Sequence, residues 1–72
     1  MIKKYFKFKR KDIALVQFII EGYEGMATVT TINPHTAIIQ ISIIPDFISD
    51  MSAIIKDLKD KYKMEEVDYP GK

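Results

Sequence analysis

The sequence contains no cysteine, no tryptophan and a single histidine. Without cysteine the chain has no disulfide, no thiolate metal site, no iron–sulfur cluster and no thiol nucleophile. The lone histidine, His35, stands in a Pro-His-Thr segment typical of an exposed turn, with no second imidazole and no acidic neighbour at ligand spacing. We therefore expect a protein that is not an enzyme, with no catalytic residues, no metal and no cofactor.

Glycine and long apolar runs are also scarce. The three glycines, Gly22, Gly25 and Gly71, form no loop that would cradle a phosphate. No window approaches the ~20 apolar residues of a membrane-spanning helix, and the N-terminus has no apolar run typical of a signal peptide. Together with the missing cysteines, these absences favour a cytoplasmic protein without a membrane partner.

The length of 72 residues predicts a single domain over 1–72. Hydrophobic residues make up 47% of the chain and charged ones 29%, which is ordinary for a folded soluble domain. A domain of this size buries only about 60% of the surface of its unfolded chain. Its core is marginal unless oligomerisation contributes.

Charge is segregated along the chain although the net charge is only +1. Residues 1–11 carry six basic side chains and no acidic one, whereas 12–50 carry five acidic side chains and neither lysine nor arginine. Such segregation indicates complementary faces, within one fold or between two copies, and less often an anion-binding edge.

The periodicity of the apolar residues predicts a ferredoxin-like α+β domain. The first predicted elements are a strand over 3–9, with Phe6 and Phe8 facing the core, and a helix from Asp12 to a stop at Gly22 or Gly25. A hairpin follows, with strands over 26–32 and 37–44 and a turn at 33–36. The last predicted elements are a helix that begins after Pro45-Asp46 and reaches Tyr62, and a short strand within 65–69. This order is the split βαβ pattern, an antiparallel sheet with both helices on one face. Asp12 and Asp46 are natural helix caps, and Gly22 suits a left-handed helix stop.

The first predicted helix has an unusually wide apolar surface. Its polar positions are Gln17, Glu21 and Glu24, which fall on one narrow stripe. A single sheet covers one face of a helix, so a second surface is expected to cover the rest, and a partner subunit supplies one. We expect a homodimer, with another protein as the alternative partner. The candidate interface residues are Gln17, Glu21, Tyr23 and Glu24. Their two glutamates can contact basic residues of a second copy.

The basic N-terminal segment is the best candidate for ligand binding. Lys9, Arg10 and Lys11 precede a helix N-terminus, which favours an anion, although Asp12 can supply that negative charge itself. Tyr5 and Lys7 lie on the open face of the predicted sheet, as aromatic residues do in RNA-recognition sheets. The function that the sequence favours is a small non-enzymatic, self-associating interaction or regulatory module. The basic segment leaves two alternatives: a nucleic-acid-binding domain that uses these five residues, and a small-anion or metabolite sensor at the basic turn.

A set of short motifs resembles a known but uncharacterised family. They are Tyr5, Arg10-Lys-Asp-Ile13, Glu21-Gly-Tyr-Glu-Gly25, Ala27-x-Val-x-Thr31 and Ile32-Asn-Pro34. The pattern resembles a domain of unknown function found as short bacterial proteins of about this length, a resemblance that implies no activity and no functional residue. The architecture is also similar to amino-acid-binding ACT domains, whose ligand loop has a glycine where this chain has Lys9-Arg10-Lys11.

Overall fold

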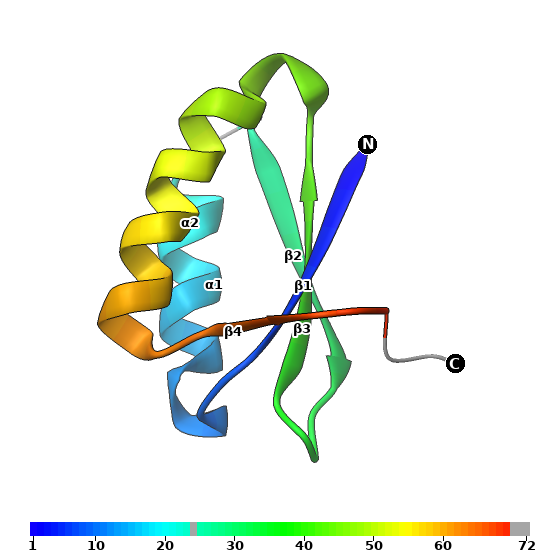
Figure 1. The fold of residues 1–72 in the computed structure, drawn as a ribbon, viewed down its shortest axis with the longest axis vertical. Helices are drawn as coiled ribbons and strands as arrows, with labels where there is room; N and C mark the ends of the chain where they lie inside the picture. Colours follow the sequence, from blue (N-terminus) through cyan, green and yellow to red (C-terminus); the bar gives the residue numbers. More distant parts are fainter. Residues whose placement is uncertain (24, 70–72) are drawn as a thin grey trace.

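The computed structural model of the chain describes residues 1–23 and 25–69. In chain order the elements are β1 (Ile2–Lys7), the 3-10 turn η1 (Arg10–Asp12), α1 (Ile13–Glu21), β2 (Ala27–Asn33), β3 (Ile38–Ile43), the 3-10 turn η2 (Pro45–Phe47), α2 (Ile48–Tyr62) and β4 (Glu65–Val67). Figure 1 shows α1 and α2 together on one side of the sheet.

The sheet has the strand order β2-β3-β1-β4, and every neighbouring pair is antiparallel. β3 therefore lies between β1 and β2, and β1 lies between β3 and β4. In the unit β1-α1-β2 the two strands are separated by β3, and in the unit β3-α2-β4 they are separated by β1. This is the arrangement of ferredoxin-like domains. The predicted α+β class, with an antiparallel sheet and both helices on one face, is confirmed.

The core lies between the helices and the inner face of the sheet. Phe6 of β1 stands opposite Ile39 of β3, and both are completely buried. The buried apolar side chains that surround them come from β2, β3, both helices and the segment after α2: Val16, Ile20, Ala27, Val29, Ile41, Ile43, Met51, Ile55, Leu58 and Met64. The alternation of β1 thus places Phe6 toward the helices as the sequence predicts.

The outer face of the sheet is polar. Tyr5 pairs in register with Gln40, Thr30 pairs with Gln40 from the other side, and Thr28 pairs with Ser42. The Tyr5 hydroxyl donates to Gln40 Oε1 at 3.2 Å, and Gln40 Nε2 donates to Ser42 Oγ at 3.1 Å. We call this side the open face.

The predicted hairpin is present and its turn is held by a side chain. Asn33 Oδ1 accepts the backbone N–H groups of His35 at 3.0 Å and Thr36 at 3.3 Å. This is the local bonding that makes asparagine a frequent turn residue. The chain leaves the turn and enters β3 through Ala37, at φ 57°.

Asp12 occupies the predicted N-cap position of α1 without a side-chain capping hydrogen bond, and the predicted cap at Asp46 is wrong. Neither α-helix has a side-chain hydrogen bond at its N-cap, because a 3-10 turn precedes each one. Within these turns the amide of Asp12 donates to the Lys9 carbonyl at 3.0 Å, and the amide of Phe47 donates to the Ile44 carbonyl at 2.8 Å. Backbone carbonyls thus satisfy amides at both helix starts.

α1 ends at the predicted stop Gly22, but the left-handed conformation predicted for this glycine is wrong. Gly22 keeps a helical conformation at φ −65°, and its amide donates to the Phe18 carbonyl at 3.1 Å. The left-handed glycine is Gly25, at φ 80°, where the chain turns toward β2. At the end of α2 the left-handed position is Lys63, at φ 56°, and β4 follows over three of the five residues predicted for it.

Candidate interaction surfaces

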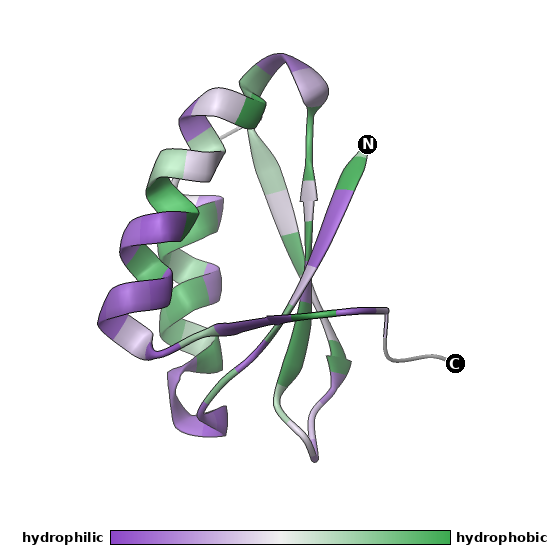
Figure 2. Cartoon of the chain, viewed as in Figure 1, coloured by the Kyte–Doolittle hydropathy of each residue, from purple (hydrophilic) through white to green (hydrophobic). Residues whose placement is uncertain are grey.

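The outer side of α1 carries an exposed apolar patch formed by Ala14, Leu15 and Phe18, which we call the α1 patch. Phe18 is 77% exposed and Leu15 is 45% exposed, while Val16 and Ile20 of the same helix are completely buried against the sheet. In Figure 2, α1 is hydrophobic over most of its length, whereas the outer side of α2 is largely hydrophilic. A helix that is apolar on both sides needs a second surface, besides the sheet, to bury its outer apolar side chains.

The apolar surface continues from α1 toward α2. A groove of about 380 Å³ is lined by Ile19, Tyr23, Ala53, Ile54, Asp57 and Leu58. Tyr23, which is 40% exposed, closes the α1 side of this groove. A partner that covers the α1 patch can therefore extend over the neighbouring surface of α2.

The four predicted interface residues do not form one exposed stripe. Glu21 and Tyr23 are exposed, Gln17 is half-buried, and Glu24 lies outside the described residues. The sequence reasoning missed Phe18 and Leu15, which are more exposed than Gln17. The signal for them was the fully apolar character of the helix, but that pattern does not say which apolar stripe faces the sheet.

The five predicted anion- or nucleic-acid-binding residues separate into two groups. Tyr5 lies on the open face with its ring centroid 5.2 Å from that of Tyr69, and Lys7 stands opposite Glu65 of β4. Lys9, Arg10 and Lys11 follow β1 in the connection to α1, and all three are exposed. Three of the five residues thus form a basic cluster just before α1, and the other two lie on β1.

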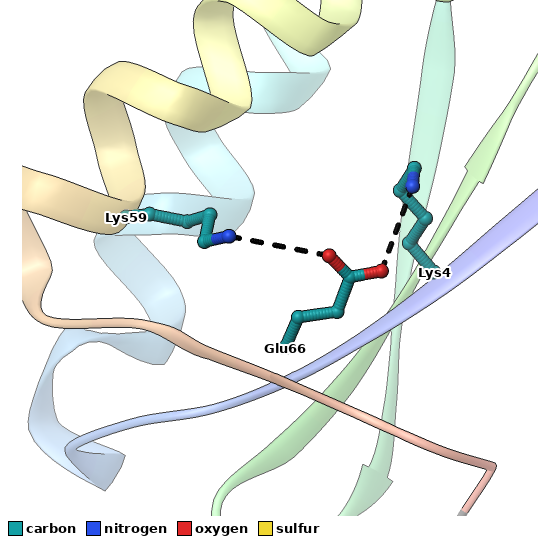
Figure 3. Close-up of polar contacts among 3 residues, drawn as sticks. All are labelled: Lys4, Lys59 and Glu66. Carbon is teal, nitrogen blue, oxygen red and sulfur yellow. Dashed lines mark ion pairs between the residues drawn. The ribbon is translucent and has the colours of Figure 1, made fainter.

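A second charged site lies on the helix side of the sheet, where Glu66 of β4 reaches two lysines (Figure 3). Its carboxylate is 3.5 Å from Lys4 Nζ and 4.0 Å from Lys59 Nζ. These groups rim a groove of about 420 Å³ whose lining includes Phe6 and Ile55. All three charged side chains are between a third and a half exposed, so these ion pairs contribute little to stability.

Over residues 1–23 and 25–69, no cluster of three or more histidine or carboxylate side chains is placed to hold a metal ion. Within the same ranges, no helix has the length and apolar character needed to cross a bilayer.

The fold and its surfaces define a small ferredoxin-like α+β domain with an exposed apolar helix. The sequence model of the family described as "Domain of unknown function (DUF4911)" matches residues 6–61, which is most of the chain. The chain belongs to this family, and the predicted resemblance to an uncharacterised short domain is confirmed. No curated protein matches the chain, and no solved structure does.

Proposed function

We propose that the protein is a non-enzymatic interaction or regulatory module of the bacterial cytoplasm that acts as a homodimer through the α1 patch. The observation that carries this proposal is Phe18, an aromatic side chain 77% exposed in the middle of a helix. Large apolar side chains that gather on one exposed face mark interaction sites. A chain of 72 residues also gains from a partner, because its own core is small.

Charge complementarity favours a second copy as the occupant. Arg10 and Lys11 are exposed at the start of α1, and Glu21 is exposed at its end. When two α1 helices pack antiparallel about a two-fold axis, the basic end of each meets the acidic end of the other. The same arrangement places Leu15 of one copy near Phe18 of the other, and a two-fold interface must be self-complementary in this way.

The test is size-exclusion chromatography with light scattering on the wild type, Phe18→Ser and a matched control, Tyr69→Ser. Tyr69 is 52% exposed but lies against Tyr5, at the open face and away from α1. We expect a wild-type dimer, a monomeric Phe18→Ser and a dimeric Tyr69→Ser. A wild-type monomer at high micromolar concentration contradicts the proposal.

One observation supports a second candidate function, nucleic-acid binding at the open face. Tyr69 joins Tyr5 there, so the face presents two adjacent rings instead of one, beside the basic side chain of Lys7. Ring stacking combined with cationic side chains is how single-stranded RNA is bound. This candidate predicts RNA binding that weakens with salt and is lost in Lys7→Glu/Lys9→Glu. Binding unchanged by these substitutions contradicts it.

A further inference from the structure

Two charged side chains lie on the helix-facing side of the sheet, where the pattern calls for apolar residues. Lys4 stands two residues before Phe6 on β1 and pairs in register with buried Ile41 of β3. Glu66 of β4 pairs in register with Phe6. Because side chains alternate along a strand and in-register partners share a face, Lys4 and Glu66 both lie on the same face as Phe6. Charged residues at such positions break the apolar pattern, and such breaks are typical of functional sites.

The helix α2 completes a groove over these two residues. Lys56, Lys59 and Asp60 of α2 line it together with Lys4 and Glu66. Three lysines and two carboxylates leave this lining with an excess of positive charge, which favours an anion. The volume of about 420 Å³ falls within the range of small-molecule pockets, about 300–1,000 Å³. The groove therefore has the size and the charge of a site for a small organic anion.

The position of Glu66 indicates which anionic group fits between the lysines. In Figure 3 its carboxylate lies between Lys4 and Lys59, with one oxygen toward each ammonium group. The two separations, 3.5 and 4.0 Å, are longer than the charge-assisted hydrogen bonds of about 2.7–2.9 Å that lysine forms with a well-seated carboxylate. Both ion pairs are solvent-accessible, so exchanging the Glu66 carboxylate for that of a ligand costs little.

The floor of the groove is apolar. Phe6, Ile55 and Met64 line it and are almost completely buried beneath the charged rim. Phe6 is the in-register partner of Glu66, so rotation of the Glu66 side chain out of the groove opens a path to this floor. An alkyl chain that takes the place of this side chain is itself removed from water, and its burial stabilises the complex.

We propose that this groove binds a small carboxylate that carries an alkyl chain. The ligand carboxylate replaces the Glu66 carboxylate between Lys4 and Lys59, and the alkyl chain covers the apolar floor. This site is independent of the proposed dimer, because its lining comes from β1, α2, β4 and Met64, whereas the α1 patch lies on the other helix.

The experiment is a titration with hexanoate, followed by the amide chemical shifts of the wild type, Lys4→Met and the matched control Lys3→Met. Lys3 is adjacent to Lys4 on β1 but is exposed on the opposite face. We expect shifts at the amides around the groove and about tenfold weaker binding by Lys4→Met, because a hydrogen bond to a charged group is lost. Lys3→Met should bind like the wild type. Glu66→Gln should bind hexanoate more tightly, because it removes the competing carboxylate.

Two further ligands test the assigned chemistry. Acetate has the carboxylate without the chain, and hexanol has the chain without the carboxylate, so each should bind about tenfold more weakly than hexanoate. Hexanoate that shifts no groove amide, or only amides around Phe18, overturns the site. Equal affinities of Lys4→Met and Lys3→Met, or of hexanol and hexanoate, overturn the role of the lysines. Weaker binding by Glu66→Gln overturns the exchange of carboxylates.

Discussion

The proposed dimer makes the free energy of unfolding depend on protein concentration. Phe18 contributes to this dependence because its burial lowers the dimer dissociation constant. Because dimerisation stabilises the folded chain, each hundredfold rise in concentration above the dimer dissociation constant adds about 2.7 kcal/mol to the apparent free energy of unfolding. A small chain has a urea m value near 1 kcal/mol/M, hence about 2 for a dimer. The wild-type urea midpoint should therefore rise by more than about 1 M over that concentration range.

The size of the Phe18→Ser effect follows from the exposure of this side chain. Complete burial of a phenylalanine side chain contributes about 1.5–3 kcal/mol, and 77% of Phe18 is left to be buried by a partner. Each copy then contributes about 1–2 kcal/mol, and the two copies about 2–4 kcal/mol. At 1.4 kcal/mol per tenfold, the dimer dissociation constant rises about 30- to 700-fold.

The assay is urea unfolding followed by far-ultraviolet circular dichroism at several protein concentrations, for the wild type and Phe18→Ser. At the lowest concentrations, where both proteins are monomeric, their midpoints should coincide within about 0.5 M, because substitutions at exposed sites change stability little. A wild-type midpoint that stays constant over a hundredfold range of concentration would refute the reasoning.

Four further substitutions test the fold, all measured by urea unfolding at one fixed concentration. Ile41→Ala, at a completely buried position in the central strand β3, should cost about 2–5 kcal/mol, and a loss below 1 kcal/mol would show that the core repacks. Gly25→Ala should destabilise by about 1 kcal/mol because its φ is 80°, whereas Gly22→Ala, at φ −65° with the added Cβ 3.2 Å from the Ile19 carbonyl oxygen, should cost less; equal effects would contradict this conformational difference. Glu66→Gln should cost less than about 1 kcal/mol, since both of its ion pairs are solvent-accessible, and a larger loss would show a stronger role for the groove.

The order and type of the elements could be predicted because each segment has a clear apolar period. The alternation around Phe6 and the isoleucine-rich pattern of β3 specify which face of the sheet is buried. Helix ends were less accessible to prediction. A sequence with Asp12 or Asp46 at a helix start is compatible with side-chain capping and with a preceding 3-10 turn, and the choice depends on how the chain leaves the preceding strand.

The candidate surfaces could be predicted only in part, for two physical reasons. The excess of apolar residues on α1 was visible in the sequence, but α1 has two apolar stripes, one through Val16 and Ile20 and one through Ala14 and Phe18. Only the packing of the helix on the sheet decides that the second stripe is exposed. The site of Lys4, Lys59 and Glu66 gave no sequence signal because it depends on β1, from the other end of the chain, pairing beside β4.

The proposed dimer also bears on the alternative function. The α1 patch faces away from the sheet, so a dimer formed through it leaves the open face of each copy uncovered. Each copy then presents its own Tyr5–Tyr69 pair to the solvent. Self-association therefore does not compete with nucleic-acid binding at this surface. If RNA binding is found, the dimer predicts that Phe18→Ser weakens binding to long RNA without any contact between Phe18 and RNA, because the variant divides a bivalent dimer into two monovalent copies.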